Sequence, residues 1–114
     1  MAKQKKDDFI VLSPLEEDIL TALSGRELYG LQIIDAIAEA SNGRRKIGFG
    51  SLYPTLHKLD KKGFVEPRWG DELEETGGAR RKYYKITGLG SRVLTETQEF
   101  RSRLAGPQPA WEGV

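Results

Sequence analysis

The sequence predicts a mainly α-helical fold with a small β-hairpin, because its pattern changes twice along 114 residues. Apolar side chains recur at helical spacing over residues 15–59 and again over residues 89–104. Between these stretches, residues 64–69 and 82–87 are rich in the aromatic and β-branched side chains that favour strands. With 38% hydrophobic residues, the chain suits one compact domain.

Two helices are expected first. The first should begin at the N-cap Ser13, with Pro14 after it and Glu16 completing a capping box, and should end near Gly25. The second spans roughly residues 31–41, where apolar residues again follow helical spacing. The first helix is interpreted as scaffold, and the second leads through a short basic turn to a third helix.

This third helix is predicted over residues 50–62, with Gly50 or Ser51 as its N-cap. Pro54 then falls in the first turn, where a proline removes no helix hydrogen bond. Gly63 is placed to end the helix as a left-handed residue just past its C-cap.

The two faces of this third helix differ in character. Leu52, Leu56 and Leu59 lie at i, i+4 and i+7 and form a stripe that can be buried. Off that stripe lie hydroxyl, imidazole and ammonium groups, which suit phosphate oxygens and the edges of bases. These polar side chains are Ser51, Tyr53, Thr55, His57, Lys58, Lys61 and Lys62.

Charge is distributed unevenly along the chain. The totals, 18 basic and 17 acidic residues, are almost balanced, so only their distribution can indicate a partner. Over residues 44–62, six basic side chains face one acid, Asp60, for a net charge of +5. The second helix, the turn and the third helix therefore form a helix-turn-helix whose last helix is interpreted as a DNA recognition helix. A solvated, lysine-rich helix surface is the alternative at this point.

A wing follows the helix-turn-helix. Residues 64–69 and 82–87 are predicted to pair as strands, and Pro67 restricts the first of them to an edge position. The intervening tip, residues 70–81, is polar and rich in glycine, as mobile hairpin ends are. Its acidic residues are Asp71, Glu72, Glu74 and Glu75, and the basic residues that follow are Arg80, Arg81 and Lys82.

Four segments match one known family in order and spacing. They are Leu28-Tyr29-Gly30, residues 50–59 (Gly-Ser-Leu-Tyr-Pro-Thr-Leu-His-Lys-Leu), Gly63-Phe64-Val65 and residues 80–87. Together they resemble the PadR-like winged helix-turn-helix transcription regulators. The short remainder after the wing is similar to the smaller subgroup of that family, which has a single C-terminal dimerisation helix.

The resemblance implies a homodimer that binds a near-palindromic operator on double-stranded DNA, usually as a repressor. It also implies DNA contacts from the recognition helix and the basic side of the wing. The acidic wing tip departs from what we expect of a wing pressed against phosphates. The contact residues are Ser51, Tyr53, Pro54, Thr55, His57 and Lys58 on the helix and Arg80, Arg81 and Lys82 on the wing, with Lys61 added from the polar face.

The chain is expected to divide into four parts. A mobile segment, residues 1–8, precedes the winged helix domain, residues 9–87. A dimerisation helix, residues 88–105, and a flexible tail, residues 106–114, come after that domain. Apolar residues spaced by four and three in the last helix are typical of packing on a partner helix, and packing inside one subunit is the alternative. These residues are Leu89, Val93, Phe100 and Leu104, with Thr97 between them.

The composition argues against an enzyme. With no cysteine and one histidine, a Ser-His-Asp relay would need His57, which lies on an exposed helix. The acids of the wing tip could gather a hard cation, but solvated acids are commoner, so we expect no metal and no cofactor. The apolar run over residues 9–12 is too short to span a membrane or act as a signal, and a cytoplasmic protein is expected.

Two further interpretations are weighed. A winged helix used for protein contact is the rival to DNA binding, and salt-dependent binding to duplex DNA would separate the two. The aromatic residues are candidates for a pocket that takes an aromatic or hydrophobic small-molecule effector, with packing in the core or wing as the alternative. They are Tyr29, Tyr53, Trp69, Tyr83 and Tyr84.

Overall fold

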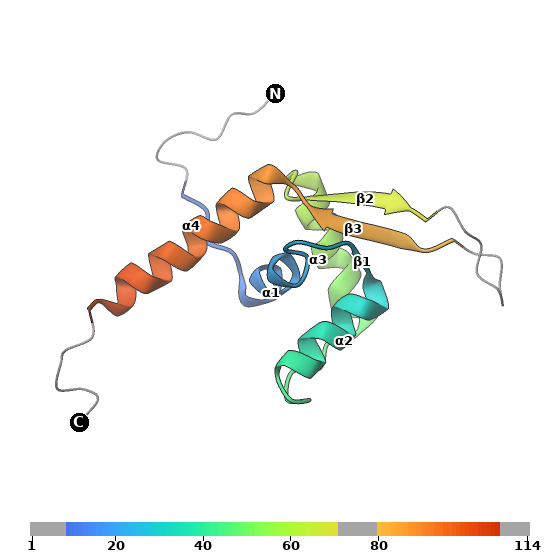
Figure 1. Cartoon of the computed structure of the whole chain (residues 1–114), viewed down its shortest axis with the longest axis horizontal. Coiled ribbons are helices and arrows are strands. Elements are labelled where there is room, and N and C mark those ends of the chain that lie inside the picture. The colour runs from blue at the N-terminus through green and yellow to red at the C-terminus, as the bar shows by residue number, and fades with distance from the viewer. Residues whose placement is uncertain (1–8, 71–79, 108–114) are drawn as a thin grey trace.

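The computed structural model describes residues 9–70 and 80–107. In chain order its elements are α1 (Pro14–Ala22), β1 (Leu28–Tyr29), α2 (Gly30–Ala40), α3 (Phe49–Lys61), β2 (Val65–Trp69), β3 (Lys82–Ile86) and α4 (Gly88–Ala105). Figure 1 shows the wing strands β2 and β3 projecting to one side of the helices and α4 to the other. No helix in the described part is long and apolar enough to cross a membrane.

Some of the sequence predictions fall outside the described residues. These are residues 1–8, which were predicted to be mobile, the acidic residues Asp71, Glu72, Glu74 and Glu75 of the predicted wing tip, and most of the predicted tail.

The start of α1 confirms the predicted capping box. The Ser13 hydroxyl oxygen accepts a hydrogen bond from the Glu16 backbone N–H at 3.2 Å, and the Ser13 N–H donates to the Glu16 carboxylate at 2.8 Å. Glu16 is buried, and its carboxylate also lies 3.8 Å from the ammonium of Lys62. The cap of α1 is therefore also an attachment point for the end of α3.

The start of α3 differs from the prediction. Its first residue is Phe49 and its N-cap is Gly48, so Gly50 and Ser51, the expected N-caps, lie inside the helix. Pro54 consequently falls beyond the first turn, where its missing N–H leaves the Gly50 carbonyl without its usual helix partner. Gly50 is exposed, so water can take that place.

The end of α3 follows the prediction. Gly63 has φ 81°, the left-handed conformation that favours glycine, directly after the C-cap Lys62. The Gly63 N–H donates to the Asp60 carbonyl at 2.9 Å, and the Phe64 N–H donates to the Leu59 carbonyl at 2.9 Å. This pair of bonds is a Schellman motif, and it turns the chain sharply into β2.

The sheet is antiparallel, with strand order β1-β3-β2. The β2–β3 hairpin is the predicted wing, and Pro67 lies in its edge strand as expected. The short strand β1 was not predicted; it falls in the gap between the first helix, expected to end near Gly25, and the second, expected to begin near residue 31. Leu28 pairs with Tyr84 and Tyr29 pairs with Tyr83, so β1 joins the wing to the start of α2.

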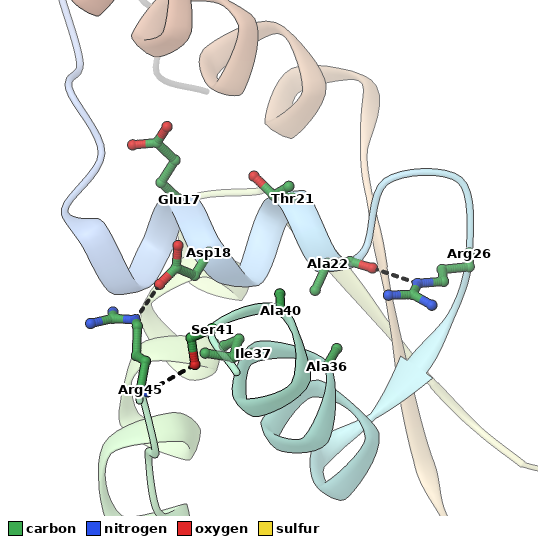
Figure 2. Close-up of a pocket in the computed structure, with 10 residues that line it drawn as sticks. All are labelled: Glu17, Asp18, Thr21, Ala22, Arg26, Ala36, Ile37, Ala40, Ser41 and Arg45. Carbon is green, nitrogen blue, oxygen red and sulfur yellow. Dashed lines mark hydrogen bonds and ion pairs between the residues drawn. The ribbon is translucent and has the colours of Figure 1, made fainter. Parts of the chain in front are cut away.

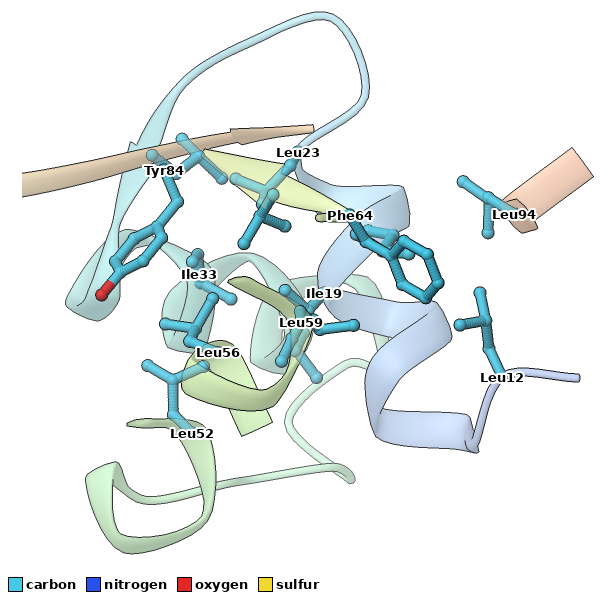
Figure 3. Close-up of a cluster of buried hydrophobic side chains, with 14 of the residues drawn as sticks. Leu12, Ile19, Leu23, Ile33, Leu52, Leu56, Leu59, Phe64, Tyr84 and Leu94 are labelled. Carbon is cyan, nitrogen blue, oxygen red and sulfur yellow. The ribbon is translucent and has the colours of Figure 1, made fainter. Parts of the chain in front are cut away.

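One hydrophobic core joins all four helices to the sheet. Figure 3 shows Leu12, Phe64 and Leu94 toward the α4 end of this core, and Leu52 and Tyr84 at the opposite end. The buried members are Leu12, Ile19, Leu20, Leu23, Leu28, Ile33, Ile37, Leu52, Leu56, Leu59, Phe64, Val65, Tyr84, Val93 and Leu94.

Thr87 joins three elements at the base of the wing. Its hydroxyl donates to the Gly63 carbonyl at 2.6 Å and accepts from the Gly90 N–H at 3.0 Å as the N-cap of α4. Its own N–H donates to the Phe64 carbonyl at 3.0 Å. A Cβ at Gly90 would collide with that same carbonyl oxygen, so the first turn of α4 packs closely against the chain leaving α3.

The first half of α4 belongs to the subunit's own core, which corrects part of the predicted dimer seam. Val93 and Thr97 have no exposed surface, and Leu89 packs against the core cluster. The Leu12 N–H donates to the Thr97 hydroxyl at 3.3 Å in this buried setting. Apolar residues spaced by four and three indicate that one face of a helix is buried. In α4 this face is covered by α1 and by the segment before α1, which includes Leu12.

The second half of α4 is more exposed. Phe100 is half-buried, and its ring meets Phe9 edge-on with 5.3 Å between the ring centroids. Arg101 pairs with Glu17 of α1 at 3.2 Å. Leu104, one turn further, is 71% exposed and is the seam residue that this subunit leaves uncovered.

Candidate DNA-binding surface

The face of α3 opposite its buried leucines presents most of the predicted contact residues. Ser51, Pro54, His57, Lys58 and Lys61 are all exposed, and Tyr53 lies at the edge of the same face. Within the described residues, the side chains of His57, Lys58 and Lys61 make no hydrogen bond or ion pair. They are therefore available to a ligand that approaches this face.

Thr55 differs from its neighbours on the predicted face. Its side chain is half-buried, and its hydroxyl donates to the Ser51 carbonyl at 2.9 Å, within the helix. The oxygen keeps its capacity to accept a hydrogen bond, but its proton is already engaged. Thr55 is thus less available than Ser51 or His57.

Two of the basic side chains in residues 44–62, the stretch with a net charge of +5, are paired with acids of α1. Arg45 pairs with Asp18 at 2.5 Å, and Lys62 lies 3.8 Å from the carboxylate of Glu16. Because α1 neutralises these two, the exposed positive charge is carried by the other basic residues of the stretch. They are Arg44, Lys46, Lys58 and Lys61.

Tyr53 connects α3 to the first residue of α2. A Cβ at Gly30 would collide with the Tyr53 hydroxyl and would lie 2.9 Å from Cζ of the same ring. The ring also stacks on that of Phe49, with centroids 5.6 Å apart and planes inclined by 18°. Phe49 was not among the predicted contact residues, because the helix was expected to begin after it. Its spacing of four residues from Tyr53 was the available signal.

The outer face of the wing carries a row of aromatic and arginine side chains. Tyr29, Tyr83 and Arg68 are neighbours across the three strands, and the Tyr29 and Tyr83 rings meet edge-on at 5.5 Å. The Arg68 guanidinium lies 5.1 Å from the centre of the Tyr83 ring, and that of Arg81 lies 4.5 Å from the centre of the Tyr29 ring. Arg68 also pairs with Glu27 at 2.6 Å, and this hydrogen bond lowers the pKa of the Glu27 carboxyl.

The predicted basic group of the wing is divided between the two faces of the hairpin. Since side chains alternate along a strand, Lys82 lies on the opposite face from Arg81. Its ammonium is 5.5 Å from the centre of the Trp69 ring and 5.9 Å from that of Tyr84, whose pKa is raised by burial. Arg80 and Arg81 are exposed, whereas Lys82 is half-buried.

A groove of about 430 Å³ lies between α1 and α2. Figure 2 shows the Asp18–Arg45 ion pair at one end and Arg26 at the other, where its Nε donates to the Ala22 carbonyl at 2.8 Å. The five candidate aromatic residues do not line this groove, so it is not the aromatic pocket that was predicted. Among residues 9–70 and 80–107, no three His, Asp or Glu side chains are placed to hold a metal ion.

Comparison with known proteins agrees with this architecture. The model of the transcriptional regulator PadR-like family matches residues 19–96. Transcriptional regulator Rv3488 of Mycobacterium tuberculosis is 30% identical over 87 residues, covering 76% of this chain and 75% of that protein. A transcriptional regulator from Clostridium thermocellum has a TM-score of 0.69 at 28% identity, covering 79% of this chain and 84% of its own. A PadR-like transcription factor from Bacteroides fragilis has a TM-score of 0.69 at 34% identity, covering 80% and 82%. The protein described here therefore belongs to the PadR-like family of transcriptional regulators.

Proposed function

We propose that this regulator is a homodimeric repressor that binds a near-palindromic operator on double-stranded DNA through α3. The observation that carries the proposal is the exposed face of α3, where His57, Lys58 and Lys61 have no partner within the described residues. A helix of this kind enters the major groove, with its polar groups directed at base edges and its lysines at phosphates. The family consists of transcriptional regulators, so no enzymatic role is proposed.

The wing supplies the second contact in this proposal. Arg80 and Arg81 are exposed directly before β3, and Arg81 lies over the ring of Tyr29. Tyr29 precedes Gly30, which in turn touches Tyr53 of α3. The wing arginines and the recognition helix are thus linked by direct packing, which supports a shared DNA-binding role.

The test is selection of duplexes from a random pool, followed by affinity measurements over a range of salt concentrations. We expect one enriched sequence and an affinity that falls steeply with salt, because phosphate contacts release counterions. His57→Ala is expected to alter the selected sequence, since it changes a group directed at the bases. Binding without an enriched sequence, or with no salt dependence, would favour the rival role in protein contact.

The proposed dimer uses the exposed second half of α4 together with the segment before α1. Phe9 is 51% exposed, Val11 41% and Leu104 71%, and Phe9 contacts Phe100 one turn before Leu104. Leu104→Glu would place a charge in this contact, at a cost of several kcal/mol if the charge stayed buried without a partner. Light scattering should then give the mass of a monomer. Thr95→Glu, at an exposed site on the same helix, is the matched control and should leave the mass unchanged.

The proposal also includes release of the operator by a small-molecule effector of aromatic or hydrophobic character. The groove between α1 and α2 falls in the usual size range of small-molecule sites, about 300–1,000 Å³, and has apolar side chains such as Ile37 in its wall. Ala36→Trp would fill part of it. An effector found by screening for operator release should lose its effect on this variant, and an unchanged response would place the effector elsewhere.

A further inference from the structure

Phe49 is a large apolar side chain at the first residue of the proposed recognition helix, and 50% of its surface is exposed. It lies outside the hydrophobic core cluster. Single exposed apolar side chains are common on protein surfaces, so exposure alone assigns no role. The place of Phe49 in the fold and the contacts that orient its ring are more informative.

The ring of Phe49 is held by its neighbours. It stacks on Tyr53 one helical turn later, with ring centroids 5.6 Å apart. Tyr53 is in turn pressed against Gly30 at the start of α2, where a Cβ would collide with its hydroxyl. The orientation of Phe49 is thus determined by two helices, which is the arrangement expected of a side chain that presents a defined surface to a ligand.

The chemistry of the major groove indicates what such a ring can recognise. The N-terminal residues of a recognition helix approach base edges, and the apolar group displayed there is the C5-methyl of thymine. Ser51, His57 and Lys58 offer hydrogen bonds, which do not distinguish thymine from uracil. Resting on the proposed function of α3, we infer that Phe49 is a specificity-determining residue that packs against thymine methyl groups in the operator.

The test removes the methyl group and the ring separately and together. Each thymine of the selected operator is replaced in turn by deoxyuridine, which lacks only the C5-methyl group. Affinities of the parent protein and of Phe49→Ala are then measured for both DNAs in a double-mutant cycle. Loss of one buried methyl group corresponds to roughly fourfold weaker binding. We expect that loss for the parent at one or two thymines in each half-site, and no further loss at those positions for Phe49→Ala.

Two controls separate this role from simpler ones. Phe49→Leu keeps an apolar side chain at the first residue of α3, so it should retain sensitivity to the methyl group. The salt dependence of binding should be the same for all three proteins, because Phe49 carries no charge. Melting temperatures within about 2 °C of the parent would show that the variants are folded, as expected for a surface substitution.

The outcomes distinguish this inference from the proposed function. If the parent selects an operator but every deoxyuridine replacement affects the parent and Phe49→Ala equally, DNA binding stands and the role of Phe49 is refuted. That role is also refuted if Phe49→Ala weakens binding without any dependence on methyl groups, as for a side chain that wedges between bases. If the parent selects no sequence, the proposed function fails and this inference fails with it.

Discussion

Replacing Gly30 with alanine is expected to push Tyr53 away from the start of α2. The added Cβ would collide with the Tyr53 hydroxyl, and it would lie 2.9 Å from Cζ of that ring and 3.4 Å from a methyl carbon of Leu52. The tyrosine ring is the group that can yield, because it is 43% exposed, whereas Leu52 is fully buried. Movement of the ring would also remove the support on which Phe49 stacks.

Two opposing effects determine the change in the free energy of unfolding. Overpacking a close contact typically costs about 1–3 kcal/mol. Alanine in place of glycine within a helix stabilises the folded state by up to about 1 kcal/mol. The expected net loss for Gly30→Ala is therefore about 0–3 kcal/mol, which is too broad a range to be tested on its own.

Gly88→Ala is a matched control, because it should give the same stabilisation from placing alanine in a helix but no collision. Like Gly30, Gly88 is the first residue of its helix, and a Cβ at this position meets no atom within 4 Å. The two alanine variants should then differ by the overpacking cost alone, about 1–3 kcal/mol, or at least about 4 °C in melting temperature. Thermal unfolding followed by circular dichroism measures this difference. Operator affinity should fall for Gly30→Ala and stay unchanged for Gly88→Ala.

The collision between the added Cβ and Tyr53 can also be relieved by removing the tyrosine ring. In a Tyr53→Ala background the two closest contacts of the added Cβ are gone and only the Leu52 methyl carbon at 3.4 Å remains, so Gly30→Ala should become neutral or stabilising. Equal melting temperatures and equal operator affinities for Gly30→Ala and Gly88→Ala in the parent background would refute the reasoning. Tyr53 would then not depend on Gly30 for its position.

Three further predictions concern charge, a buried hydrogen bond and pH. Lys58→Ala and Lys61→Ala should each weaken binding to all duplexes and reduce the salt slope by about one phosphate, and an unchanged slope in both would contradict their assignment. Thr97→Val should cost about 1–3 kcal/mol in urea unfolding, because the buried Leu12 N–H loses its acceptor, whereas Thr97→Ser should cost less. Burial raises the pKa of Tyr84, so its contribution to stability is complete below the unfolded value of about 10 and is lost as pH rises further. Tyr84→Phe should lose less stability than the parent above that pH, and parallel curves would contradict this assignment.

Features set by neighbours in the sequence could be predicted. The capping box of Ser13 and Glu16 depends on residues three apart, and the left-handed Gly63 depends on the end of one helix. The buried stripe of α3 likewise follows from spacing alone. Helix ends and buried faces are local properties, and the structure reproduces them.

Features set by distant partners could not be predicted. The two residues of β1 are a strand only because β3 lies beside them. The spacing of Val93 and Thr97 indicates that their face of the helix is buried. It does not indicate whether the same chain or a second chain covers that face. The start of α3 was misplaced because its N-cap, Gly48, has no side chain to signal it. The available positive charge of residues 44–62 was overestimated because Asp18, which pairs with Arg45, lies 27 residues away in the sequence.

The junction at Thr87 has a mechanical consequence for the spacing of half-sites that the proposed dimer could bind. Through its hydrogen bonds to Gly63 and Gly90, Thr87 attaches the base of α4 to the end of α3, the proposed recognition helix, so that α4 acts as a lever. Eighteen residues give this lever a length of about 27 Å, so a tilt of about 7° at its base moves its far end by roughly 3.3 Å. That displacement is close to the rise of one base pair, about 3.4 Å. In the proposed dimer, the stiffness of this junction and of the core packing of Val93 and Thr97 would therefore together decide whether the protein tolerates operators whose half-sites are one base pair closer or further apart.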